Sequence, residues 1–144
     1  MTTAAATPAA APGPIKGHRQ MVDEASAKIR RYTVEEAMAR LQDPDVQFVD
    51  IRDVRELERE GVVPGAMHAP RGMIEFWVDP SSPYHKPQFA QPKEFIFFCA
   101  AGWRSALTTA TVQEIGLQNV ADIEGGFGAW KAAGAPVAEK AKKA

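Results

Sequence analysis

The stretch FIFF-CAAGWR-SALTTATVQEI, residues 95–115, places an apolar run, a loop of mostly small residues and a helix-forming segment in direct succession. The apolar run, residues 95–98, has the length of a strand and no polar alternation, which is typical of a strand buried on both faces of a parallel sheet. Gly116, followed by Leu117, ends the helical segment in the manner of a glycine C-cap. The stretch therefore predicts a strand, a short loop and a helix, in that order.

The rest of the chain continues this alternation. Residues 46–51 (VQFVDI) and 120–123 are further strand-length apolar runs, and residues 29–32 form a short candidate strand before them. Thr33 and Glu36 have the spacing of a capping box at the start of another helix, and residues 127–133 predict the last one. Strands that alternate with helices predict an α/β domain with a mainly parallel central sheet and helices on both faces.

The length of the chain bounds the number of domains. A chain of 144 residues accommodates one ordinary domain with a hydrophobic core. We expect residues 1–17, rich in Ala and Pro, to be a disordered arm, because they have little apolar surface to bury. Residues 18–28 predict a short helix, residues 29–137 the folded domain, and residues 138–144 a polar tail.

Composition excludes several classes of function. The formal charge of −1 gives no global positive potential to attract nucleic acid or an anionic membrane. No apolar run approaches about 20 residues, so we expect a soluble protein without a membrane span. One cysteine and three scattered histidines predict no zinc site. The N-terminal residues lack the pattern of a secretory signal, which favours a cytoplasmic location.

The lone cysteine, Cys99, stands where chemistry is expected in an α/β fold. The carboxyl ends of parallel strands line the ligand crevice, and the N-terminus of the following helix presents unpaired N–H groups. Small residues after Cys99, including Gly102 with its access to positive φ, allow these groups to converge on one anion. Together with Arg104 they favour a thiolate, which is the nucleophilic form. The alternative is a buried, inert cysteine.

Four segments in chain order resemble the motifs of one family. Residues 99–105 (CAAGWRS) resemble the C-x-x-G-x-R-S active-site loop of rhodanese-like sulfurtransferases. Residues 50–56 resemble the D-[VI]-R-[DE]-x-x-E segment of that family, residues 61–70 its G-H-I-x-G-A-x-x-x-P turn, and residues 119–130 its closing N-V-x-x-L-x-G-G-x-x-x-W. The resemblance covers residues 30 to 137 and implies a single rhodanese-like domain.

The resemblance implies a function. The Cys99 thiolate would attack a sulfane sulfur of a donor such as thiosulfate or a persulfide, leaving a Cys99 persulfide that a thiol, cyanide or a partner protein in a sulfur relay then discharges. No cofactor or metal is required. The residues of the anion-binding loop would be Ala100, Ala101, Gly102, Trp103, Arg104 and Ser105, with Asp50 and Arg52 as supporting residues.

Two further functions stay open beside sulfur transfer. One is a non-catalytic rhodanese-fold module for binding or sulfide sensing. The other is a dual-specificity phosphatase or arsenate reductase, whose C-x-x-x-x-x-R loop is one residue longer than residues 99–104 and encloses a larger oxyanion. Ala101 stands where two-domain thiosulfate enzymes commonly carry a basic residue, which predicts weak thiosulfate binding.

The sequence also suggests roles for the side chains around this loop. We expect Asp50 either to orient Arg104 and the loop or to cap a helix. Ser105 is interpreted as an early helix residue whose hydroxyl could donate to the thiolate. Phe76 is interpreted as part of an aromatic cover over the sheet, and Trp103 either as a wall of the pocket or as part of the same cover. A solvated, ion-paired helix face is expected from Arg52, Asp53, Glu56 and Glu58. The three histidines, His18, His68 and His85, are interpreted as structural.

Overall fold

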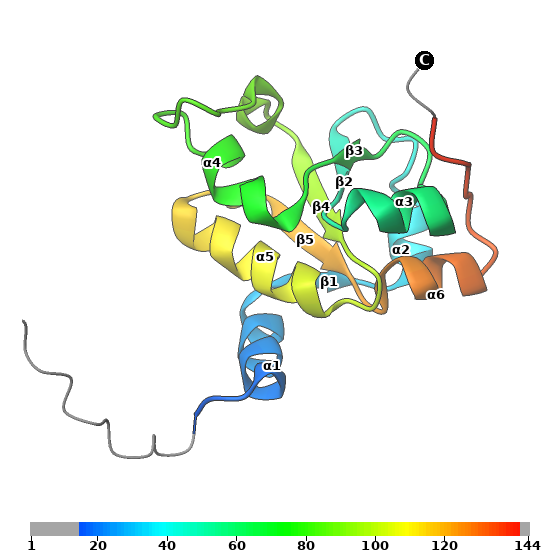
Figure 1. Cartoon of the computed structure of the whole chain (residues 1–144), viewed down its shortest axis with the longest axis horizontal. Helices are drawn as coiled ribbons and strands as arrows, with labels where there is room; N and C mark the ends of the chain where they lie inside the picture. The colour runs from blue at the N-terminus through cyan, green and yellow to red at the C-terminus, as the bar shows by residue number, and fades with distance from the viewer. Residues whose placement is uncertain (1–14, 142–144) are drawn as a thin grey trace, which may run out of the picture.

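The computed structural model describes residues 15–141, which form one α/β domain around a five-stranded parallel sheet (Figure 1). The strand order is β1-β5-β4-β2-β3, and every paired strand is parallel to its neighbour. The strands are β1 (Arg30–Tyr32), β2 (Val46–Asp50), β3 (Met67–His68), β4 (Glu94–Phe98) and β5 (Val120–Ile123). The predicted fold class is confirmed, whereas residues 1–14 of the arm expected at residues 1–17 lie outside the described residues.

Within residues 15–141, six α-helices surround the sheet, and two short 3-10 turns lie before and after α4. The helices are α1 (His18–Lys28), α2 (Val34–Met38), α3 (Val54–Glu60), α4 (Ile74–Val78), α5 (Trp103–Ile115) and α6 (Gly126–Ala132), and the turns are η1 (Arg71–Met73) and η2 (Pro87–Ala90). Thr33 begins α2 through the capping box that the sequence predicts, and Gly116 ends α5 with a φ of 130°. Propensity and capping signals thus placed these helix ends correctly.

The central strand β4 explains why its sequence lacks polar alternation. Ile96 and Phe98 belong to a hydrophobic cluster with α2 and α6, while Phe95 and Phe97 belong to a second cluster with α4 and α5. Successive side chains of a strand point to opposite faces, and here helices cover both faces. Burial of each of these side chains stabilises the fold by about 1.5–3 kcal/mol. The strand therefore holds the residue after it, Cys99, at a rigid position.

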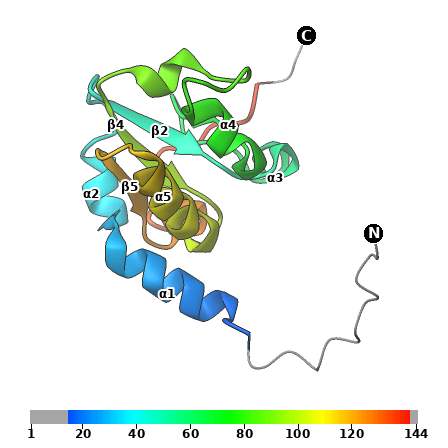
Figure 2. The same ribbon diagram turned by 90° about the vertical axis from the view of Figure 1, so that its left-hand side faces the viewer.

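Helix α1 lies beside α5, at the periphery of the domain (Figure 2). Val22 and Ala25 are buried in a small cluster with Ala106 of α5. The helix is therefore held by its apolar face and adds a structural element next to the start of α5.

The segment between β3 and β4 contains three elements that the sequence did not predict, η1, α4 and η2. Ile74 and Val78 of α4 are buried beneath it, but Phe76, expected to cover the sheet, is 51% exposed. Residues four apart share one face of a helix, so Ile74 and Val78 face the core and Phe76 cannot. The aromatic cover expected of Phe76 is therefore wrong.

Candidate active site

The loop after β4 turns sharply back into α5. Gly102 immediately precedes the helix with a φ of 93°, and a Cβ there would lie 3.1 Å from both the Gly125 nitrogen and the Arg31 Nη2 atom. Both the left-handed backbone and the close approach require a glycine. The loop consequently brings the first amides of α5 back toward Cys99.

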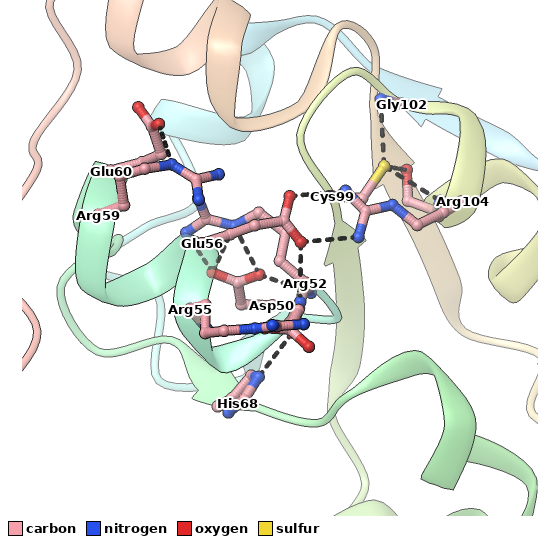
Figure 3. Close-up of polar contacts among 12 residues, drawn as sticks. Asp50, Arg52, Arg55, Glu56, Arg59, Glu60, His68, Cys99, Gly102 and Arg104 are labelled. Carbon is pink, nitrogen blue, oxygen red and sulfur yellow. Dashed lines mark hydrogen bonds and ion pairs between the residues drawn. The ribbon is translucent and has the colours of Figure 1, made fainter.

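Two backbone amides point at the sulfur of Cys99 (Figure 3). The N–H groups of Gly102 and Ser105 lie 3.2 and 3.3 Å from Sγ. Cys99 is only 1% exposed, so little water competes with these donors. Converging amides at a helix N-terminus favour a negative charge, and this arrangement supports a thiolate or a related sulfur anion at Cys99.

The carbonyl groups of the same loop are held by other elements. Two backbone N–H groups near the start of α6 donate to these carbonyl oxygens. The Phe127 amide donates to the Cys99 oxygen at 2.7 Å, and the Gly128 amide donates to the Ala100 oxygen at 2.9 Å. Arg31 of β1 donates through Nη2 to the Gly102 oxygen at 2.9 Å. Because these carbonyls are engaged away from the sulfur, the loop presents N–H groups rather than C=O groups to Cys99.

Arg104 is bound by Glu56 of α3. Its Nη1 and Nη2 atoms donate to the two carboxylate oxygens at 3.0 and 2.9 Å, a bidentate pair that Figure 3 shows beside the cysteine. Glu56 also accepts the Asp53 amide at 2.9 Å. The hydrogen bonds between the two side chains lower the pKa of Glu56 and raise the pKa of Arg104. The ion pairing expected for Glu56 is present, but its partner is Arg104 of α5 and the pair is only partly exposed, so Glu56 holds Arg104 in place.

Asp50 and Arg52 form a buried pair that does not contact Arg104. Arg52 Nη2 donates to Asp50 Oδ2 at 2.7 Å and to the Gly61 oxygen at 2.8 Å. Its guanidinium lies 4.0 Å from the centre of the Phe127 ring, and Arg52 is 1% exposed. The expectation that Asp50 orients Arg104 is therefore wrong, and so is the solvated face expected of Arg52. Burying either charge alone would be costly, so the two must be buried together.

Asp53, rather than Asp50, caps the following helix. Its carboxylate accepts the Arg55 amide at 2.8 Å, and its capping box with Glu56 begins α3. Asp53 itself is exposed, as expected for a member of the solvated face, and so is Glu58. The helix therefore starts at a position that fixes Glu56 opposite Arg104.

A second ion pair near the cysteine, between a buried carboxylate and a partly exposed guanidinium, was not predicted from the sequence. Asp122 of β5 is 0% exposed and accepts Arg31 Nε at 2.8 Å and Arg31 Nη2 at 3.0 Å. The Ser105 hydroxyl lies 2.8 Å from Asp122 Oδ2 and 3.6 Å from Cys99 Sγ. A carboxylate inside a strand predicted to be buried is itself a signal, because a buried charge requires a partner.

Trp103 lies at the surface of the loop instead of in a core. It is 53% exposed, and its ring centre lies 5.3 Å from that of His18 in α1. A cavity of about 200 Å³ adjoins the pair, lined by Trp103 with His18, Arg19, Val22 and Asp23. Trp103 and α1 thus line this cavity together, but Cys99 is not among its lining residues, and the role of Trp103 as a wall of the active-site pocket stays a prediction.

The part of the chain from residue 15 to residue 141 offers no group of three or more His, Cys, Asp or Glu side chains that could hold a metal ion. None of the helices described in that range is long and apolar enough to cross a membrane.

The parallel α/β fold and the loop around Cys99 can now be compared with those of known protein families. Residues 33–133 match the family model of the Rhodanese-like domain, and the chain belongs to that family. The expectation from the sequence motifs is confirmed at this level.

Three individual proteins are similar to this chain in sequence or in structure. A protein of Allochromatium vinosum named "Sulfurtransferase" is 29% identical over 93 residues, 65% of this chain and 78% of its own. The polysulfide-sulfur transferase homodimer of Wolinella succinogenes is 27% identical with a TM-score of 0.65, covering 85% of this chain and 87% of its own. A Rhodopseudomonas palustris structure described as a "Protein of Unknown Function" and "Possible Tyrosine Phosphatase" is 50% identical with a TM-score of 0.85, covering 90% of this chain and all of its own.

The Glu56–Arg104 ion pair predicts that replacing Glu56 lowers the free energy of unfolding at neutral pH but not in acid. Glu56→Gln should lower the free energy of unfolding at pH 7 by about 0.5–1 kcal/mol, a modest loss because the pair is partly exposed and screened. The pKa of Glu56 is lowered in the folded state, so its contribution is present above the unfolded value of about 4.3 and is lost as the pH falls through the folded pKa. Urea unfolding of both proteins from pH 7 to pH 3 measures this difference.

The exposed Glu58 supplies the matched control, because Glu58→Gln removes the same charge from the same helix without breaking the pair. It should leave the stability within about 0.5 kcal/mol of the wild type. A Glu56→Gln protein that is destabilised equally at pH 7 and pH 3 would contradict the assigned role of this pair.

Proposed function

We propose that the protein is a sulfurtransferase that moves a sulfane sulfur atom through a persulfide on Cys99. The observation that carries this proposal is the pair of amides, from Gly102 and Ser105, that donate to the Cys99 sulfur. A positioned sulfur anion is the nucleophile that such transfer needs. The named sulfurtransferase relatives support the same chemistry.

The reaction has two displacement steps. The Cys99 thiolate attacks the outer sulfur of the donor, so that a new S–S bond forms while the S–S bond of the donor breaks. Sulfite leaves if the donor is thiosulfate, and a thiolate leaves if the donor is a persulfide. A thiolate or cyanide acceptor then attacks the terminal sulfur of the Cys99 persulfide, and the electron pair of the broken bond returns to Cys99 Sγ.

Backbone amides of the loop stabilise the negative charge that Cys99 carries before and after sulfur transfer. The amides of Gly102 and Ser105 stabilise Sγ before the first attack and again when the acceptor leaves with its sulfur. Glu56 compensates the charge of Arg104, so the amides rather than this guanidinium carry most of the stabilisation. Asp50 and Arg52 act only through the backbone that they support.

The burial of Cys99 limits the donor. With the residue 1% exposed, a donor must present its reactive sulfur at a narrow end, as thiosulfate, polysulfides and small persulfides do. The acceptor is a small thiol, cyanide or a partner protein in a sulfur relay. A single free cysteine suits a reducing compartment, and we place the activity in the cytoplasm.

Phosphatase activity is the alternative suggested by the description of the Rhodopseudomonas palustris protein as a possible tyrosine phosphatase. The loop from Cys99 to Arg104 has only six residues, and Arg104 is already bound bidentately by Glu56 instead of being free for a phosphate. Thiocyanate formation from polysulfide or thiosulfate and cyanide, measured beside hydrolysis of an aryl phosphate, separates the two. Sulfur transfer without phosphate release supports the proposal, and the reverse result would overturn it.

The side chain at position 101 predicts the affinity for thiosulfate. The side chain is exposed and brings no cation to the sulfonate of this donor. Ala101→Lys should lower KM for thiosulfate about five- to thirtyfold with kcat similar, because the new charge meets the sulfonate before and during transfer. Steady-state kinetics at low and high salt measure the change, which should shrink as salt screens the charge.

Ala101→Gln is the matched control, since it adds a side chain of comparable length without a charge. It should leave KM within about twofold of the wild type. If glutamine lowers KM as much as lysine, side-chain length rather than charge sets donor affinity, and the assignment of this position is wrong.

A further inference from the structure

The ion pair of Asp122 and Arg31 has no part in the steps above, although the Ser105 hydroxyl connects Asp122 to the cysteine. Asp122 is fully buried, and Arg31 donates to both of its oxygens at 2.8 and 3.0 Å. The two hydrogen bonds from the guanidinium define an ion pair in which Asp122 is the carboxylate partner. An ionised carboxylate only accepts hydrogen bonds.

The proton of Ser105 is therefore committed to the carboxylate. The Ser105 hydroxyl lies 2.8 Å from Asp122 Oδ2, and because Asp122 only accepts, Ser105 must be the donor. A hydroxyl has one proton, so its oxygen lone pairs are left to face Cys99 Sγ at 3.6 Å. In this arrangement the Cys99 thiol donates to Ser105, and Ser105 has no proton to offer a thiolate.

We propose that Asp122 is a positioning residue that holds the Ser105 hydroxyl away from Cys99 in the thiol state and releases it to the sulfur when Cys99 ionises. In the thiol state the hydrogen bonds run from Cys99 to Ser105 to Asp122. In the thiolate state the Ser105 proton turns to Sγ. This inference rests on the proposed function, because it describes how the nucleophile of that reaction changes protonation state.

Arg31 makes the second state accessible. When the Ser105 hydroxyl turns away, Asp122 keeps both hydrogen bonds from Arg31 and loses only one of its three hydrogen bonds. Arg31 also donates to the Gly102 oxygen at 2.9 Å, and the Gly102 amide donates to Sγ. One guanidinium therefore fixes the carboxylate and the loop together, so that the proton of Ser105 is the part that moves.

Other charged groups act on Cys99, on Asp122 or on their partners, and the test must leave these groups unchanged. They are Arg31 in β1, Asp50 with Arg52 at the end of β2, Glu56 in α3, Arg104 in α5, and Glu124 after β5. Each of them is kept in the variants below.

The test compares Asp122→Asn in two backgrounds, with Ser105 present and with Ser105→Ala. An asparagine retains an oxygen for Arg31, and its amide can donate to the Ser105 oxygen, which frees the hydroxyl proton for sulfur. We expect the rate of Cys99 alkylation by iodoacetamide at pH 7 to rise about three- to tenfold, with the pH profile moved to lower pH. In the Ser105→Ala background the rise should fall to less than half of this.

An equal rise in both backgrounds would overturn the proposal, because removal of the negative charge alone would then explain it. No rise, or a slower rate, would overturn it as well. Circular dichroism and thermal unfolding establish that the variants are folded.

A second measurement does not depend on Asp122→Asn being folded. The infrared S–H stretch of the wild-type thiol should lie at the lower frequency of a hydrogen-bonded donor, and Ser105→Ala should move it to that of a free thiol. A wild-type band already at the free position would overturn the proposal. Neither readout needs sulfur transfer, so failure of the proposed function and failure of this inference are distinguishable.

Discussion

Cys99→Ala should abolish sulfur transfer, leaving less than about one thousandth of the wild-type rate with every donor. The variant removes the sulfur on which the amides of Gly102 and Ser105 converge, and Cys99 is the single cysteine of the chain. The fold should persist, because the lost sulfur leaves only a small cavity that costs about 1 kcal/mol. Thiocyanate production and thermal unfolding, measured on the same preparation, check the two halves of this expectation.

Cys99→Ser is the matched control for shape. It keeps the size of the side chain and places a hydroxyl, a much weaker nucleophile at neutral pH, among the same amides. The serine variant should be as inactive as the alanine variant while matching the stability of the wild type more closely. Thiocyanate production by either variant at a rate comparable to the wild type would show that the proposed nucleophile is wrong.

Gly126→Ala should produce the largest loss of stability, about 2–4 kcal/mol, together with a loss of activity. Gly126 begins α6 with a φ of 58°, and a Cβ there would lie 2.4 Å from the Cys99 oxygen and 2.9 Å from the Ala100 backbone. These are backbone atoms of the active-site loop, so the contact cannot be relieved by rotation of a flexible side chain. The loop must shift to relieve the contact, and the amides around Cys99 shift with it.

Gly134→Ala separates backbone strain from this contact. Its φ of 76° also disfavours a side chain, but nothing lies within 4 Å of the added Cβ. We expect it to cost about 1–2 kcal/mol and to leave the turnover of the folded enzyme unchanged. Urea unfolding and kinetics of both variants measure the difference, and equal effects of the two substitutions would refute the role given to the α6 contact.

The sequence predicted the elements that carry the nucleophile because their signals are local. The unalternating run at residues 95–98 is buried by helices on both faces, and the small residues before α5 form the tight loop that brings the Gly102 amide to the sulfur. Capping boxes and terminal glycines likewise act within one or two turns of a helix. Such features can be read from neighbouring residues alone.

Several residues whose roles the sequence did not predict depend on partners far along the chain. Arg104 is held by Glu56, 48 positions away, and Arg31 by Asp122, 91 positions away. Arg31 and Asp122 are directly paired in the register of β1 and β5, a register that the sequence of neither strand encodes by itself. Arg52 looks like part of a charged helix face until Phe127 and Gly61 are seen to enclose it.

The central claim is that Cys99 carries the transferred sulfur, and intact-protein mass spectrometry tests it most directly. The protein is incubated in turn with thiosulfate, polysulfide and glutathione persulfide, without acceptor, and its mass is read before and after cyanide is added. The account predicts one added sulfur atom on Cys99 with at least one donor, its removal by cyanide, and no addition to Cys99→Ala. A wild-type mass that stays unchanged with all three donors, or an equal gain in the alanine variant, would contradict it.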